Sequence, residues 1–311
     1  MGHATAEDML TVFESSIEGL NKKGVLQLSM YDPNVNWKLY SILQREIQAG
    51  SNTSLFNVGS CGLHIEYGAY KKGIDSTGWN LSSLLFAFHR LFKDSPTRRD
   101  DHCNVLDDDF PLMPLKHCPT RWVENVSVLE RALELLPNMK AFVKAVQKKT
   151  IPNPQTKTFD TVKEACADLL LPVKLHFPIF VAKQVDPFLA KYQSDKPMLP
   201  FLVSDLFQIL KSLMERFVKQ GHLNKMTTPE KLARFDVADS KSHKSYDHVD
   251  ISFSSKKKMK DLVHEGNVSK RQSMGVNMVC KLCLQKLVGS IMEKAPIKYP
   301  LARNLACFKP N

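Results

Sequence analysis

The spacing of apolar residues is the feature that most constrains how this chain folds. From residue 60 onward, apolar side chains recur every three or four positions, which is the period of an amphipathic helix. Only two short segments, 25–30 and 54–59, have the composition of β-strands, and each follows a segment of helical periodicity. We therefore expect a mainly α-helical protein with a small α/β part. Its two strands would run parallel, joined by a right-handed crossover.

The chain divides at a lysine- and proline-containing segment, which we expect to be a linker over residues 148–158. It would separate an N-terminal domain, 1–147, from a second helical region, 159–311. In that second region, the Ser- and Lys-rich residues 240–273 predict a mobile loop. Two strands are too few for an independent sheet, because two-stranded ribbons are marginal in water. We therefore expect the chain to be a fragment of a larger fold.

Several helices are expected outside the strand-containing part. The apolar pattern predicts them over 79–92, 128–142, 201–218 and 276–294. Proline lacks the amide hydrogen that a helix interior needs, so Pro137 should divide or kink the second of these. For the same reason, prolines at three positions should break the segment 159–192 into shorter helices, namely Pro172, Pro178 and Pro187.

Composition narrows the class of protein. The hydrophobic fraction is 43% and the charged fraction 24%, which excludes a disordered or collagen-like chain. No apolar run reaches the roughly 18 residues of a membrane helix, and the start of the sequence has no signal-peptide pattern. We expect a soluble intracellular protein with its seven cysteines as thiols. Its net charge of +11 favours polyanionic partners such as nucleic acid, although a basic soluble protein without such a partner fits equally well.

Asp32 follows the first predicted strand and precedes a predicted helix. Open α/β sheets place ligands and metals at that edge, and a carboxylate there would suit a divalent metal in phosphoryl transfer. Such a site usually needs several carboxylates. The alternative is structural, because an aspartate before Pro33 can simply cap the helix.

Cysteine and histidine form two short motifs. Cys61 and His64 can share a helix face, but a zinc site needs four ligands and no partner pair is evident. A nucleophilic Cys-His pair is the other possibility, but the sequence does not place the third group that would activate it. Cys280 and Cys283 lie within the last predicted helix, and we expect them to be buried thiols.

Cationic residues supply the candidate nucleic-acid contacts. Arg121 and Trp122 offer a guanidinium for phosphate and a ring for base stacking, or they anchor a helix contact. The run 256–258 of three lysines is either a phosphate-contacting or nuclear-import patch or solvated charge.

Several of these motifs occur together in one order along the chain. They are Gly-His-Ala-Thr-Ala at 2–6, Leu-Ser-Met-Tyr-Asp-Pro-Asn-Val-Asn at 28–36, Cys-Gly-Leu-His at 61–64, Phe-Lys-Asp-Ser-Pro-Thr-Arg-Arg at 92–99 and Thr-Arg-Trp-Val-Glu-Asn at 120–125. In this ordered set the chain resembles the hAT-like transposase-derived proteins, which are related to cut-and-paste DNA transposases. The resemblance is strongest between residues 1 and 145.

The resemblance implies a truncated ribonuclease H-like core, with about two parallel strands, and a helical insertion region. It also implies an Asp-Asp-Glu triad that binds divalent metal, with Cys61 and His64 as motif residues beside it. At the second acid of that triad this chain has Tyr31, and Asp32 stands one residue later. Because strand side chains alternate between faces, that shift turns the carboxylate away. The other two acids have no counterpart between Met1 and Asn311.

The expected function is therefore a catalytically inactive, transposase-derived nuclear protein that binds DNA weakly and without sequence preference. Arg98, Arg99, Arg121 and Trp122 would contribute most, mainly through phosphate contacts. We expect no cofactor; Mg²⁺ or Mn²⁺ would enter only if flanking residues supplied the missing acids and made an active transposase. A helical protein-interaction module is the other alternative.

Overall fold

A computed structural model describes residues 4–28, 30, 34–50, 53–57, 59, 62–109, 111–119, 122–194 and 196–309, without the side chains of Lys23 and Trp122. Within these ranges the regular structure is helical, and no β-strand is present. Only one isolated antiparallel bridge, between Val218 and His243, joins two segments in the manner of a sheet. The expected ribonuclease H-like core with two parallel strands is therefore wrong for the described part of the chain.

The contacts of Leu55 explain why the second predicted strand does not form. Its amide donates to Gln44 Oε1 at 2.8 Å, and its carbonyl accepts from the Tyr40 hydroxyl at 3.2 Å. Both partners belong to α2 (Asn34–Gly50), so a neighbouring strand cannot use these groups. Between the described residues of the two predicted strands, a single backbone hydrogen bond remains, from Phe56 N to Leu26 O at 2.7 Å. The β-like composition is thus used to pack against a helix.

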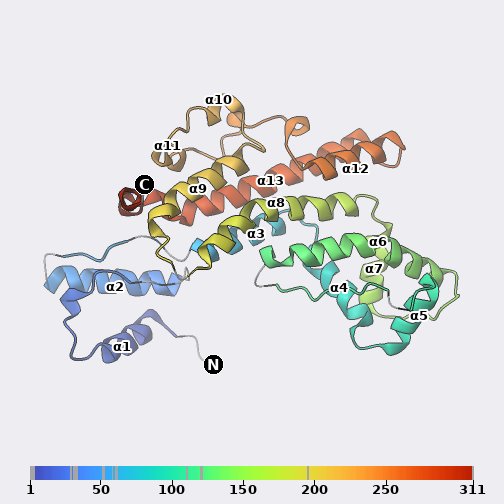
Figure 1. The fold of residues 1–311 in the computed structure, drawn as a ribbon, viewed down its shortest axis with the longest axis horizontal. Helices are drawn as coiled ribbons and strands as arrows, with labels where there is room; N and C mark the ends of the chain where they lie inside the picture. Colours follow the sequence, from blue (N-terminus) through green and yellow to red (C-terminus); the bar gives the residue numbers. More distant parts are fainter. Residues whose placement is uncertain are drawn as a thin grey trace.

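Described residues between Leu10 and Leu55 build a small apolar cluster of their own. Its helix α1 (Ala6–Ser16) begins with a capping box, in which Thr5 and Asp8 satisfy each other's backbone amides. Helix α1 packs on α2, and a short 3-10 helix η1 (Lys22–Gly24) links them. Lys22 forms ion pairs with both helices. Figure 1 shows α1 and α2 at one end of the molecule.

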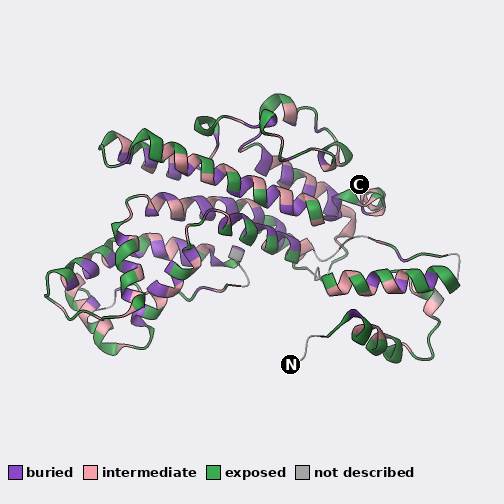
Figure 2. Ribbon diagram, turned by 180° about the vertical axis from the view of Figure 1, so that it is seen from behind, coloured by how far each residue is buried: buried purple, intermediate pink, exposed green. Residues whose placement is uncertain are grey.

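The main core lies among long helices. Helix α3 (Gly62–Asp75) packs along α13 (Lys270–Lys294), and α8 (Leu171–Tyr192) packs against α6 (Val126–Gln147) and α12 (Phe253–His264). Figure 1 shows α3, α8 and α13 in the middle of the molecule, and Figure 2 shows buried residues along the helices there. Helix α9 (Leu199–Met214) closes one end of α13.

A helical subcluster covers the opposite end of the core from α1 and α2. It consists of α4 (Leu81–Lys93), α5 (Pro96–Leu106) and α7 (Lys157–Ala167), all packed against α6. His102 of α5 is buried between the rings of Phe92 and Phe142, and burial lowers its pKa.

The remaining elements are short. They are η2 (Trp122–Asn125), α10 (Gln220–Leu223), α11 (Pro229–Ala233), η3 (Ser240–Ser242), η4 (Tyr246–His248), η5 (Pro296–Lys298), α14 (Pro300–Asn304) and η6 (Leu305–Phe308).

Proline interrupts these helices less than the sequence predicted. Helix α6 runs through Pro137, so it is not divided there. Helix α8 runs through Pro178 and Pro187, so the breaks expected at these two positions are wrong. Pro172 lies in the first turn of α8, where its missing amide hydrogen costs nothing. Extensive burial of both helices stabilises them enough to offset the lost backbone hydrogen bonds.

The polar segment 240–273 also differs from expectation, because α12 forms where a loop was predicted. Ser252 caps the helix by accepting a hydrogen bond from the amide of Ser255 at 3.1 Å. Met259 and Leu262 bury one face, while the lysines occupy the others. A narrow apolar face was therefore enough to fix the helix on the core.

Among the described residues, no single helix has both the length and the apolar character needed to cross a membrane. Helices α7 and α8 meet that test only as a pair, and they are bent by 93° at the break between them.

A buried carboxyl group makes folding depend on pH. Glu66 of α3 is 1% exposed, and neither of its carboxyl oxygens has a hydrogen-bond partner. Burial raises the pKa of Glu66 to about 8. The native state therefore keeps this proton over a pH range in which the unfolded chain, with a glutamate pKa of about 4.3, releases it.

We predict that stability falls as the pH rises from about 4.5 to 8, by up to ~1.4 kcal/mol per pH unit, and levels off above. Glu66→Gln should remove this slope and make the protein more stable than wild type at pH 8. Urea unfolding at pH 5 and pH 8 measures both. Parallel pH profiles for the two proteins would contradict the prediction.

Candidate nucleic-acid interface

The C-terminal half of α6 carries lysines on one face. Lys140, Lys144 and Lys148 are spaced four residues apart, so their side chains rise along the helix by about 6 Å per step. All three are exposed. Positive charge near a helix C-terminus also interacts favourably with the helix dipole, which stabilises α6 with or without a ligand.

The chain leaves α6 through an unusual backbone conformation at Lys149. Its φ of 61° lies in the left-handed region that glycine normally occupies. Two hydrogen bonds close the helix end around it, from Lys149 N to Val146 O and from Thr150 N to Ala145 O, both at 3.0 Å. This is the Schellman arrangement, with lysine in the place of the usual glycine. The turn therefore carries a cationic side chain at a position where its backbone conformation is unfavourable for any residue other than glycine.

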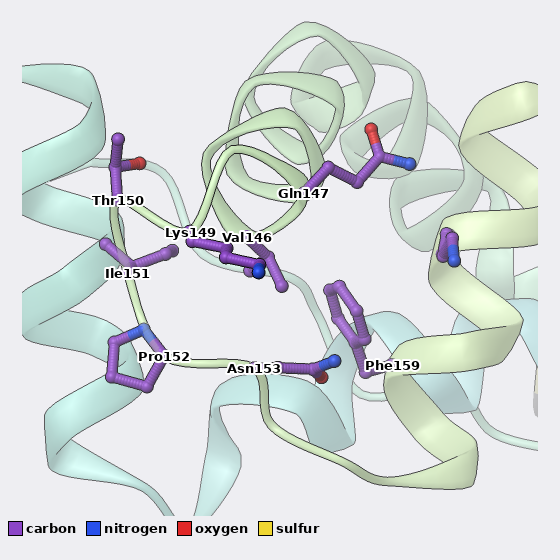
Figure 3. Close-up of a pocket in the computed structure, with 9 residues that line it drawn as sticks. Val146, Gln147, Lys149, Thr150, Ile151, Pro152, Asn153 and Phe159 are labelled. Carbon is purple, nitrogen blue, oxygen red and sulfur yellow. The ribbon is translucent and has the colours of Figure 1, made fainter.

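A cavity of about 710 Å³ lies between this turn and α7. Val146, Ile151 and Phe159 contribute its apolar walls, and Lys149, Asn153 and Lys163 contribute polar groups. Figure 3 shows these elements around the cavity, with the Phe159 ring and the Asn153 amide beside each other. Phe159 is only 3% exposed, because its ring also packs edge-on against Phe142. Its face is therefore closed to base stacking.

The charge around the cavity is unbalanced. Residues 140–163 contain six lysines and a single acid, Asp160. We call the six together the α6–α7 lysine surface: Lys140, Lys144, Lys148, Lys149, Lys157 and Lys163. Each is exposed, and none forms an ion pair with any residue that the structure describes. By contrast, the nearby Lys174 and Lys183 pair with Asp168 and Glu130 at 2.6 and 2.5 Å. Positive charge is therefore left uncompensated at this surface.

Arg98 and Arg99, predicted to contact nucleic acid, lie on α5. Arg98 is half-buried and donates from Nη1 to the carbonyl of Leu91 at 3.0 Å, which ties α5 to α4. Arg99 is exposed, but five aspartates follow these arginines within ten residues, at 100, 101 and 107–109. Acidic residues so close in sequence reduce the positive potential that the arginines supply.

Several other predicted residues lie outside the described part of the chain. Tyr31, Asp32, Cys61 and Arg121 are among them, as is the side chain of Trp122. His64 is exposed on α3. Within the described ranges, no group of three or more His, Cys, Asp or Glu side chains could hold a metal ion.

Cys280 and Cys283 are buried on α13, as predicted, and both are free thiols. Burial raises the pKa of each thiol. Both groups therefore stay protonated thiols at neutral pH, which favours a role in packing over one in reaction.

The segment 122–125, which carries part of the family resemblance, contacts α3 three residues beyond the motif at 61–64. The Tyr67 hydroxyl on α3 donates to Glu124 Oε1 at 3.0 Å in η2, and Gln193 Nε2 donates to the Tyr67 oxygen at 3.3 Å. Asn125 is paired with the backbone of Cys118 in both directions, at 2.8 and 2.7 Å. These contacts position the segment after residue 121 against α3. They involve neutral donors and a single acid, and so favour a structural role.

Sequence reasoning missed the α6–α7 lysine surface, because residues 148–158 were interpreted as a linker. Its signal was present in the ratio of six lysines to one acid over residues 140–163. No family model matches the chain, and no curated protein or solved structure matches it either. The resemblance to hAT transposase-derived proteins therefore stays a prediction.

The positive φ at Lys149 predicts that two variants with the same loss of charge differ in stability. Lys149→Gly should stabilise the protein by up to about 1 kcal/mol, because glycine adopts a positive φ without steric cost. Lys149→Ala removes the same charge but keeps the unfavourable conformation, so it is the matched control and should give no gain. Thermal unfolding of the two variants measures the difference, and equal melting temperatures would argue against strain at this turn.

Proposed function

We propose that this protein binds nucleic acid without sequence preference through the α6–α7 lysine surface. The observation that carries the proposal is the set of six exposed lysines that form no ion pair with the described residues, two of which, Lys149 and Lys163, line one cavity. Nucleic-acid backbones attract such clusters because each neutralised phosphate releases a condensed counterion. The resemblance to hAT transposase-derived proteins supports DNA as the polyanion and the nucleus as its location.

The geometry favours phosphate contacts over base contacts. Lysines about 6 Å apart along α6 present flexible ammonium groups that can follow a phosphate backbone. The only aromatic wall of the cavity, Phe159, is buried and cannot stack on a base. Phosphate contacts fix position but carry no sequence information, so binding should be non-specific. The proposal assigns no catalytic step to the chain.

One observation favours the helical protein-interaction module as a second candidate. Met274, Met278 and Leu282 recur every four residues on α13 and are 46%, 50% and 39% exposed. The three span only about 12 Å of helix. A stable interface usually buries about 800 Å² on each partner, which is more than these side chains offer. The apolar face therefore gives less support than the lysine surface.

Salt dependence tests the proposal. The triple variant Lys140→Ala, Lys144→Ala, Lys148→Ala should lower the slope of log affinity against log salt by about 2 to 3, since each phosphate contact contributes about 0.9. Fluorescence anisotropy with labelled double-stranded DNA at several salt concentrations measures this slope.

The matched control is the triple alanine variant of Lys71, Lys183 and Lys191, which pair with Asp75, Glu130 and Asp205. It changes the net charge equally but should leave the slope nearly unchanged. Equal slopes for the two triple variants would refute the assignment, as would salt-independent binding. A larger loss in Arg98→Ala, Arg99→Ala would place the interface on α5 instead.

A further inference from the structure

A second cationic pocket lies where the chain after α9 crosses α13. It is a cavity of about 480 Å³, lined by Lys219, Gln220, Lys244, Ser245 and His248. These residues come from the start of α10 and from the segment that includes η4. In Figure 1, α10 and this segment lie above α13, whereas α6 and α7 lie below α8. The pocket is therefore separate from the α6–α7 lysine surface.

Backbone pairing brings the two lysines of this pocket together. At the isolated bridge between Val218 and His243, Lys219 N donates to Ser242 O at 2.8 Å and Lys244 N donates to Phe217 O at 2.7 Å. Val218 and His243 are buried, so the neighbouring Lys219 and Lys244 face the other way, toward the pocket. Local pairing thus fixes the positions of both cations.

The ammonium groups here are held by uncharged partners. Lys219 donates to the carbonyl of Lys241 at 2.8 Å, and Lys244 donates to that of Glu215 at 2.6 Å. Lys281 of α13 donates to the carbonyl of Lys244 at 3.0 Å. Each ammonium keeps two further N–H donors.

The lysines are close enough to repel one another. Burial lowers the pKa of Lys281, and the positive charge of Lys219 lowers it further. Mutual repulsion among ammonium groups is relieved when an anion binds between them. On the same wall, the Ser245 hydroxyl lies 2.8 Å from His248 Nδ1, and both side chains add hydrogen-bonding groups.

We propose that this pocket binds a phosphate group, of the dianionic kind found in phosphomonoesters and inorganic phosphate. Two lysines line the cavity, and Lys281 is bonded to the backbone of one of them. This charge suits a group that carries about −1.5 to −2 charge and several strong acceptor oxygens. The cavity volume also lies within the usual range for small-ligand sites. Either a small phosphorylated molecule or the terminal phosphate of a nucleic-acid strand would supply this chemistry.

Titration calorimetry with inorganic phosphate at constant ionic strength tests the site. Lys219→Gln, Lys244→Gln removes both charges while the glutamine amides can still donate to the carbonyls of Lys241 and Glu215. This double variant should weaken phosphate binding at least tenfold. The control Lys225→Gln, Lys231→Gln changes the same charge on exposed lysines outside the pocket and should bind as wild type does.

A second variant tests the site independently if the double variant is too unstable for a binding measurement. His248→Ala removes an exposed pocket residue and should weaken phosphate binding severalfold. Absence of saturable phosphate binding, or equal weakening in pocket and control variants, would overturn the proposal.

Oligonucleotides with and without a 5′-phosphate distinguish the two sources. If the pocket variants lose a preference for the phosphorylated strand, the phosphate comes from nucleic acid. If they change only the binding of inorganic phosphate, the natural ligand is a small phosphorylated molecule. Each of these results supports the same site, and neither depends on the α6–α7 lysine surface.

Discussion

The close packing of α3 against α13 is the contact on which the rest of the structure depends. At Gly73 an added Cβ would lie 3.0 Å from the Cβ of Leu287 and 3.1 Å from the carbonyl oxygen of Cys283, so the two helices approach only because glycine is there. On the adjoining side of α3, the Tyr70 hydroxyl donates to the carbonyl of Pro178 in α8 at 2.8 Å. Helices α3, α8 and α13 are thereby joined, and α6, α9 and α12 pack onto them. Glu66 of α3 is buried in the same region, so the stability of this packing depends on pH.

Charge is distributed around that core in two different ways. Where elements pack closely, lysine and arginine pair with acids, as Arg216 does with Asp250 at 2.6 Å. At the end of α6 and in the pocket beside α13, lysines instead have carbonyls or solvent as partners. These lysines therefore lack a carboxylate partner among the described residues. Because unpaired cations attract anions most strongly, both proposed binding surfaces lie where such lysines gather.

Local sequence signals predicted single elements well. The long helix that ends at Lys294 and the buried thiols of Cys280 and Cys283 were both expected, because each depends on a few neighbouring residues or on one helical face. The strand at 54–59 was wrong, since a side chain of α2 takes the amide of Leu55. Pro137 does not divide its helix for a related reason: burial against other helices outweighs the local preference.

The sequence by itself determined the mainly helical character, the positions of most helices and the excess of positive charge, because periodicity and composition are local properties. Only the tertiary structure decided which charges remain unpaired and which of them converge. Lys219 and Lys244 line one pocket because the backbone pairs Val218 with His243, twenty-five residues later in the chain. The choice between a strand and a helix-packed segment at Leu55 was likewise made by Gln44 and Tyr40. Such pairings depend on the arrangement of distant segments, which no local pattern specifies.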